Sequence, residues 1–103
     1  MVQQIIWSVE AEKNLVEIKQ YITQHSLFYA EKIIRGLVAK AQTLLTHPEQ
    51  GMIVLISGDV SYWRLLYKSY RIIYFYKQST VYIVAVFHQA RQIPDHFDNH
   101  LFS

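Results

Sequence analysis

The hydrophobic period of the sequence changes once, at Gly51, and this change limits the chain to folds that combine helices with a sheet. Before Gly51, apolar residues recur every three or four positions, which is the spacing of one face of a helix. After Gly51, segments rich in Tyr, Ile, Val, Phe and Trp follow a period close to two, as strands do. The order of these patterns predicts an α+β domain, with helices in the first half and strands in the second.

Two helices are predicted before Gly51. The first is expected to begin after the N-cap Ser8 and to end near residues 25–26. The second keeps its apolar spacing through residues 30–45 and is expected to stop at residues 47–51, which include a proline and a glycine. Gly36 lies inside the second helix, where glycine costs about 1 kcal/mol relative to alanine. We therefore expect this glycine to allow close packing against the first helix.

Apolar segments with short connections follow Gly51, which predicts antiparallel pairing between neighbours. Turn residues separate them at 57–59 and 78–79. A short strand is also expected before the first helix, at residues 2–7. We therefore expect one domain over residues 1–103, in which an N-terminal strand and a two-helix hairpin pack on a small, mostly antiparallel β-sheet. The strands of the second half are predicted at residues 52–56, 61–67, 70–77 and 80–87.

Composition excludes several classes of protein and of site. The chain has no cysteine, which excludes a disulfide framework, a cysteine zinc site and a thiol nucleophile. No apolar stretch approaches the roughly 18 residues of a membrane span, and the N-terminus lacks the positive segment of a signal peptide, so the expected location is the cytoplasm. No glycine-rich phosphate loop occurs, and no cofactor is expected. His96 and His100 have no third ligand, so no metal site is predicted.

Positive charge is concentrated in the second half of the sequence. Residues 1–50 hold five basic and five acidic residues and are neutral overall, whereas residues 95–103 hold two acids, Asp95 and Asp98. An excess of cations on an aromatic-rich sheet predicts a surface that attracts phosphates or an acidic protein. The basic residues between positions 51 and 94 are Arg64, Lys68, Arg71, Lys77 and Arg91, against one acid, Asp59.

Arg64 and Arg71 are candidates for the centre of this basic surface. Side chains alternate faces along a strand, so the length of the connection at 67–70 decides where they point. An even number of connecting residues places Arg64 opposite Ile73. Leu66 then lies opposite Arg71, and both arginines share one face at about 7–8 Å. An odd number would place them on opposite faces. In a third interpretation, each arginine pairs with a carboxylate from a helix.

His88 ends the last predicted strand, and Arg91 follows it closely. A histidine beside arginines has a pKa near neutrality and could act as a general acid or base in phosphodiester cleavage. The alternative is a structural histidine that hydrogen-bonds to the C-terminal segment. The tyrosines of the sheet raise a similar choice, between stacking on bases and packing in the sheet. They are Tyr62, Tyr67, Tyr70, Tyr74, Tyr76 and Tyr82.

Several short motifs, each weak alone, occur in a specific order over about residues 5–94. They are Trp7-Ser8 with Ala11 and Leu15; Ile18 with Tyr21-Ile22; Ala30-Glu31; Leu44 before His47-Pro48 and Gly51; Arg64; Tyr70-Arg71-Ile72-Ile73-Tyr74; and Val86-Phe87-His88-Gln89-Ala90-Arg91. Their order and spacing resemble the RelE/ParE superfamily of toxins from type II toxin–antitoxin systems. The resemblance is nearer to the ParE-like branch.

This resemblance implies a fold, a partner and a target. The implied fold is two N-terminal helices packed on a small antiparallel sheet, and the implied partner is a cognate antitoxin whose C-terminal segment wraps around the toxin. ParE-like toxins poison DNA gyrase, whereas RelE-like toxins cleave messenger RNA on the ribosome. The long helical hairpin and the segment 88–91 are closer to the ParE-like group, so inhibition of DNA gyrase is the leading prediction.

The two branches imply different roles for the basic residues. In a ParE-like toxin none of them need be catalytic. The catalytic candidates of a RelE-like nuclease are Arg64, Arg71, His88 and Arg91. The candidates for contact with an antitoxin or a target are Arg64, Lys68, Arg71, Tyr74, His88 and Arg91.

Three functions are therefore compatible with the sequence. The first is a growth-inhibiting toxin that blocks gyrase, the second a ribosome-dependent mRNA endonuclease, and the third an inactive toxin-like binding module. The basic sheet predicts an amphipathic antitoxin segment with acidic residues. In the free toxin, Asp95 and Asp98 could lie over the same sheet.

Overall fold

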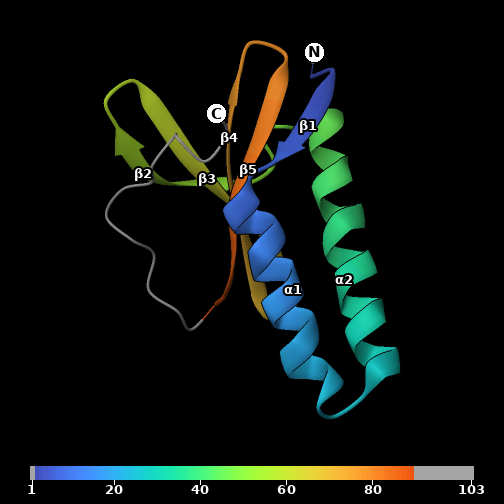
Figure 1. Cartoon of the computed structure of the whole chain (residues 1–103). Coiled ribbons are helices and arrows are strands. Elements are labelled where there is room, and N and C mark those ends of the chain that lie inside the picture. Colours follow the sequence, from blue (N-terminus) through green and yellow to red (C-terminus); the bar gives the residue numbers. More distant parts are fainter. Residues whose placement is uncertain (1, 90–103) are drawn as a thin grey trace.

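The computed structural model describes residues 2–89, and the change of period at Gly51 corresponds to the change from helices to sheet (Figure 1). Within the described residues, both helices precede Gly51, and every strand except the first follows it. The predicted α+β class and order of elements are confirmed. The elements are β1 (Gln4–Trp7), α1 (Val9–Thr23), α2 (Leu27–Gln42), the 3₁₀ turn η1 (Thr43–Leu45), β2 (Met52–Ser57), β3 (Val60–Tyr67), β4 (Tyr70–Lys77) and β5 (Thr80–His88).

The strands form one sheet in the order β1-β5-β4-β3-β2, so β1 sits beside β5, the last strand of the described residues. β1 runs parallel to β5, and the other three pairs are antiparallel, which confirms the mostly antiparallel sheet. Each hairpin has a two-residue turn that begins with a left-handed residue: Gly58 at φ 63°, Lys68 at φ 50° and Gln78 at φ 57°. Turns of this kind match the twist of the paired strands.

Serine N-caps set where the two helices begin. The Ser8 Oγ accepts a hydrogen bond from the Ala11 N–H at 2.9 Å, as predicted. α1 ends at Thr23, earlier than predicted, because the next serine caps a second helix. Ser26 is extended, and its Oγ accepts a hydrogen bond from the Tyr29 N–H at 3.1 Å. α2 therefore begins before its apolar spacing becomes visible in the sequence.

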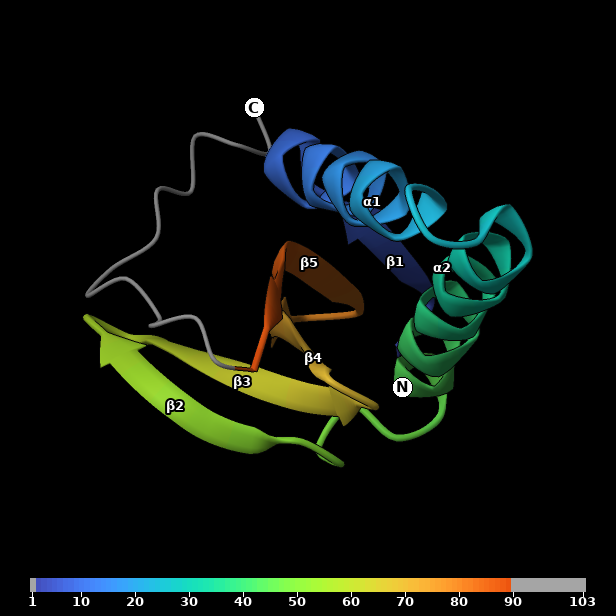
Figure 2. The ribbon, with the colours of Figure 1, turned by 90° about the horizontal axis from the view of Figure 1, so that it is seen from below.

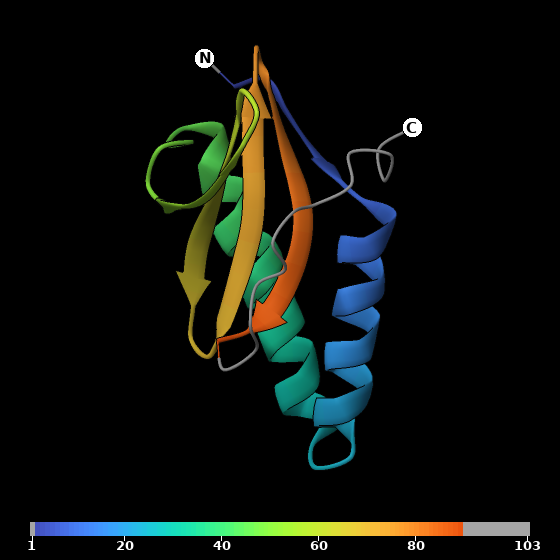
Figure 3. The ribbon, with the colours of Figure 1, turned by 90° about the vertical axis from the view of Figure 1, so that its left-hand side faces the viewer.

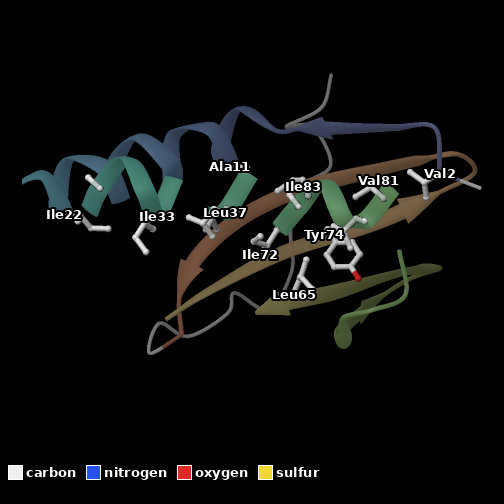
Figure 4. Close-up of a cluster of buried hydrophobic side chains, with 14 residues drawn as sticks. Val2, Ala11, Ile22, Ile33, Leu37, Leu65, Ile72, Tyr74, Val81 and Ile83 are labelled. Atoms are coloured by element: carbon white, nitrogen blue, oxygen red, sulfur yellow. The ribbon is translucent and has the colours of Figure 1, made fainter. Parts of the chain in front are cut away.

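The larger hydrophobic cluster lies between the helices and the sheet (Figure 4). α2 contributes Ile33 and Leu37, which are almost fully buried. Ile72 from β4 and Ile83 from β5 belong to the same cluster, and neither is exposed. The apolar stripe of the second helix therefore packs into the cluster on the helix-covered face of the sheet.

Gly36 packs against the sheet, not against the first helix. A Cβ atom at this position would overlap the hydroxyl group and ring of Tyr67 on β3. The expectation of a helix–helix contact at Gly36 is therefore wrong, because the missing side chain makes room for a tyrosine.

A second cluster of buried side chains lies on the other face of the sheet. Ile73 of β4 and Phe87 of β5 belong to it, and they are 0% and 6% exposed. Figure 2 shows both helices on one side of β4 and β5, with β2 and β3 curving across the other side. The sheet therefore has a helix-covered face and an opposite, strongly curved face.

The helix that follows β1 completes the edge of β5. β1 pairs only with residues 80–83, and the chain then turns directly into α1 beside β5 (Figure 3). The Ser8 N–H donates to the Ile83 carbonyl at 2.9 Å, and the Ser8 hydroxyl donates to the Val84 carbonyl at 2.8 Å. Nearly two turns later, the Asn14 Oδ1 accepts a hydrogen bond from the Val86 N–H at 2.9 Å. The buried side chains of the N-cap Ser8 and of Asn14 in α1 thus bond to the edge of β5 where β1 no longer pairs with it.

Candidate functional site

Arg64 and Arg71 share one face of the sheet, which decides between the alternatives left open by the sequence. The β3–β4 turn has two residues, so Arg64 lies opposite Ile73 and Leu66 lies opposite Arg71. Ile73 belongs to the cluster on the curved face. Both arginines therefore point to the curved face, away from the helices.

The two arginines sit in partly apolar surroundings. Arg64 is partly buried, and its Nη2 lies 3.4 Å from the Sδ of Met52 on β2. Arg71 is also partly buried, and its cross-strand neighbours are Leu66 on β3 and Phe87 on β5. Guanidinium groups beside apolar side chains suit a ligand that offers both carboxylates and apolar contacts.

Lys68 lies at the tip of the β3–β4 hairpin and is exposed. Its Nζ is 5.7 Å from the centre of the Tyr67 ring. The Lys68 carbonyl accepts a hydrogen bond from the Gln89 side-chain amide at 2.6 Å, and the Ser69 carbonyl accepts one from the Gln89 N–H at 2.8 Å. The residue after β5 therefore ties down the turn that carries this lysine.

His88 lies on the opposite face from the arginines. It pairs with Tyr70, and their ring centroids are 5.6 Å apart in an edge-to-face arrangement. Tyr70 packs against the helix-side cluster, whereas Arg71 and Phe87 point the other way. The sheet thus brings Arg64 and Arg71 together and separates both from His88.

The helix-facing side of His88 borders a cavity between α1 and the end of β5, with a volume of about 420 Å³. Burial raises the pKa of the Tyr70 hydroxyl, and the nearby Tyr29 and Tyr21 hydroxyls add to this shift. The cavity lining includes Asn14, Glu17, Tyr21, Tyr70, Phe87 and His88. Its aromatic walls suit an apolar segment with a few polar groups.

Tyr74 belongs to the core and offers no surface to a partner. Its side chain is 0% exposed, and its hydroxyl donates a hydrogen bond to the Pro48 carbonyl at 2.7 Å. The same oxygen accepts a bond from the Gly51 N–H at 3.2 Å. Burial raises the pKa of Tyr74 to about 12, although the Gly51 bond opposes that shift. The structure therefore places this predicted contact residue where it holds the loop before β2.

Several predicted residues lie outside the described residues. They are Arg91, His96, His100 and the acids Asp95 and Asp98. Among residues 2–89, no three histidine or acidic side chains come close enough to hold a metal ion together. Neither α1 nor α2 is long and apolar enough to cross a lipid bilayer.

Two features of the surface were not assigned to particular residues from the sequence. The end of the helical hairpin carries exposed aromatic residues: Phe28 is 74% exposed and Tyr21 is 65% exposed. Along β2, Met52 and Ile56 are 61% and 65% exposed. Phe28 falls outside the apolar stripe of its helix, which is a signal that sequence reading can detect. β2 gave no such signal, because its apolar residues suit a buried strand equally well.

The fold and sequence were compared with known proteins. The sequence profile of the family described as "ParE toxin of type II toxin-antitoxin system, parDE" matches residues 5–93. A solved structure, "Chromosomal ParDE TA system from P. aeruginosa", matches with a TM-score of 0.67 and 18% sequence identity, over 85% of this chain and 96% of that chain. At this identity the match shows a shared fold. A search of curated proteins found no match.

The family assignment rests on the profile, which covers residues 5–93 and therefore both helices, β2 to β5 and all of β1 except Gln4. The structural match independently supports the fold. The predicted resemblance to ParE-like toxins is therefore confirmed, and the chain belongs to the ParE toxin family of type II toxin–antitoxin systems.

Proposed function

We propose that this toxin inhibits DNA gyrase and is neutralised by a cognate antitoxin. Membership of the ParE toxin family supports this function. The observation that favours it over RNA cleavage is the separation of His88 from Arg64 and Arg71 by the sheet. A general acid or base must reach the same reacting group that the arginines bind, and opposite faces of a sheet do not allow this.

Gyrase inhibition is tested with purified toxin, purified gyrase and relaxed plasmid DNA. The expected result is a dose-dependent loss of supercoiling that is reversed by adding the antitoxin first. Toxin that arrests growth but leaves supercoiling normal, both in cells and in the purified reaction, would contradict gyrase as the target.

The antitoxin contact is proposed to use the curved face of the sheet. This face combines Arg64 and Arg71 with apolar side chains, so it suits an amphipathic segment that carries acidic residues. Exposed ion pairs weaken as salt screens them, over a Debye length of about 8–10 Å at physiological ionic strength. Affinity should therefore fall as salt rises.

Calorimetric titration with the antitoxin at several salt concentrations tests this contact. Arg71→Ala is expected to weaken binding by about tenfold, since a partly buried charged pair is worth roughly 1–3 kcal/mol. Lys32→Ala is the matched control, because it removes one positive charge from the exposed surface of α2. Equal effects of the two variants, or an affinity independent of salt, would argue for a mainly apolar contact elsewhere.

The alternative function is a ribosome-dependent mRNA endonuclease. The observation in its favour is that Arg64 and Arg71 share one face, near Lys68 in the β3–β4 turn. This function predicts new ends in translated messages after induction, which Arg71→Ala should abolish while the fold stays intact. Mapping RNA ends in induced cells distinguishes the two candidate functions, because inhibition of gyrase does not create new ends in translated messages.

The remaining alternative is an inactive toxin-like binding module. It predicts normal growth after induction without the antitoxin, together with normal antitoxin binding. Growth curves with and without the neighbouring antitoxin gene test it directly. Arrest that the antitoxin relieves would exclude an inactive module.

A further inference from the structure

The outer edge of the sheet at β2 is apolar, and among residues 2–89 no further strand pairs with it. β2 is the last strand in the sheet order, and Figure 2 shows it along the outside, with β3 on its inner side. Residues 52–57 contain no charged residue and no proline. Met52, Ile53 and Ile56 are 61%, 49% and 65% exposed. Natural proteins usually protect an edge strand with charges, proline or a bulge. β2 has a bulge at residue 54 but neither of the other two devices, so its exposed apolar side chains indicate a pairing surface.

The exposed side chains of β2 point to two different faces of the sheet. Ile53 pairs with Trp63 and Ile56 pairs with Ser61, and these two partners lie two residues apart on β3. In a regular strand, residues three apart point to opposite faces. The extra residue of the bulge at position 54 shifts this alternation by one, so Ile53 and Ile56 share one face. Met52 and Ser57 lie on the other face by the same reasoning.

We propose that a second copy of this chain pairs with β2, strand to strand and antiparallel, across a two-fold axis. In this arrangement Ile53 of the first copy lies opposite Ile56 of the second copy. The two-fold axis generates the equivalent pair, in which Ile56 of the first copy lies opposite Ile53 of the second. Met52 lies opposite Ser57 of the second copy in the same register. Opposed residues in a sheet share a face, so the pairing joins four isoleucines into one patch. A two-fold interface requires such self-complementarity.

Charge also favours a second copy over an unrelated extended segment. Arg64 lies beside Met52 at one end of β2, and Asp59 follows the other end. Antiparallel pairing therefore carries Arg64 of each copy toward Asp59 of the other. The two Arg64 side chains stay at opposite ends of the interface, where salt screens their repulsion.

The small size of the contact sets the expected affinity. Pairing through a six-residue strand buries less surface than the roughly 1,200 Å² of a standard stable interface. The expected product is a dimer that forms with a dissociation constant on the order of micromolar or weaker. This inference does not depend on the target of the toxin.

Sedimentation equilibrium of the purified chain over a range of concentrations tests the dimer. Wild type is expected to shift from monomer to dimer as concentration rises. Ile56→Lys should stay monomeric, because each copy would bury a lysine against Ile53. Val16→Lys is the matched control: Val16 is 55% exposed on α1, far from β2, and its variant should dimerise like wild type. A monomeric wild type, or equal behaviour of the two variants, would overturn the proposal.

Cross-linking tests the register without relying on a destabilising change. The chain has no cysteine, so introduced thiols have no competitors. Opposed residues of an antiparallel pair have Cα atoms about 4.5–5.5 Å apart, which suits a disulfide. A mixture of Met52→Cys and Ser57→Cys chains should therefore form mixed disulfide dimers on mild oxidation. The Met52→Cys chain alone should not, because its two thiols would lie about 17 Å apart. Equally fast cross-linking of that chain alone would refute the register.

Discussion

The two edges of the sheet differ in whether a neighbouring segment covers them. Where β1 stops, α1 continues along the edge of β5 and supplies Ser8 and Asn14, which are 1% and 4% exposed, to its backbone. At the other edge, β2 lies open and apolar. Side chains of the same chain thus bond the backbone of one edge, whereas β2 is the outermost strand of the sheet in the described residues. An edge can be closed by side chains of a neighbouring helix as well as by another strand.

The difference extends to how each edge is anchored. The closed edge is held at several points along its length by hydrogen bonds from residues near the N-terminus. The open edge is anchored where the chain approaches it, by the Tyr74 hydroxyl that binds Pro48 and Gly51. Substitutions at the two edges should therefore affect different properties: stability at the first and association at the second.

The largest expected effect is at Asn14. Asn14→Leu keeps a similar side-chain volume but leaves the buried Val86 N–H without its acceptor, which costs roughly 2–3 kcal/mol of unfolding free energy. Urea unfolding followed by tryptophan fluorescence measures this loss. Gln20→Leu, at an exposed position of the same helix, is the control and should change stability by less than about 0.5 kcal/mol. Similar losses for both variants would show that the helix does not close the edge.

Ser8→Ala should have the next largest effect, about 1–2 kcal/mol, because the hydroxyl both caps α1 and donates to the Val84 carbonyl. Ser26→Ala removes only a cap, at the start of α2, and should cost less. The difference between the two variants in urea unfolding isolates the bond to β5. A smaller loss for Ser8→Ala than for Ser26→Ala would argue against that bond.

Tyr74→Phe tests the anchor of the open edge. At pH 7 the loss of two hydrogen bonds should cost about 1–2 kcal/mol, whereas Tyr29→Phe, at a half-exposed position, should cost almost nothing. The pKa of Tyr74 is raised from 10.0 to about 12, so its neutral form stabilises the fold fully below pH 10. Between pH 10 and 12 the unfolded chain loses this proton first.

That difference in proton binding makes wild-type stability fall across this pH range by roughly 2–3 kcal/mol from this one group. The stability advantage of wild type over Tyr74→Phe should therefore shrink as pH rises from 10 and should be lost or reversed by pH 12. Unfolding curves at several pH values measure it. A gap that stays constant would contradict a buried, neutral tyrosine.

Ile56→Thr should have the smallest effect on stability. The side chain is 65% exposed on the edge strand, so the change in unfolding free energy should be within about 0.5 kcal/mol. Threonine keeps the branched shape that strands favour. Unfolding measured below the concentration of any dimer checks this value. A loss comparable to that of Asn14→Leu would mean that β2 is held as tightly as β5.

Much of the fold could be predicted from the sequence because its signals are local. The change of period at Gly51 located the helices and strands, and Ser8 located the start of α1. The sheet-facing role of Gly36 could not be predicted, because its partner, Tyr67, is distant in sequence. The hydrogen bond between Asn14 and the backbone of β5 could not be predicted either, because it depends on where β1 stops pairing with β5.

The candidate site was predicted less well than the fold. Whether Arg64 and Arg71 share a face depends on the β3–β4 turn, and its left-handed residue is Lys68, which does not mark such a turn in a sequence. His88 was grouped with the arginines because they are close along the strands. Its pairing with Tyr70 places it on the other face. Proximity to a strand end therefore says little about a site until the register is known.

The parallel pairing of β1 with β5 has a consequence for folding during synthesis on the ribosome. Gln4 finds its partner only at Thr80, so the first strand made by the ribosome must wait until nearly all of the described domain has been translated. Ser8 and Asn14 must also wait, for Val84 and Val86. A nascent fragment that lacks residues 80–88 therefore has no complete sheet to act with. A chain that ends before residue 80 therefore lacks the pairing partners of β1, Ser8 and Asn14, and with them the assembled sheet.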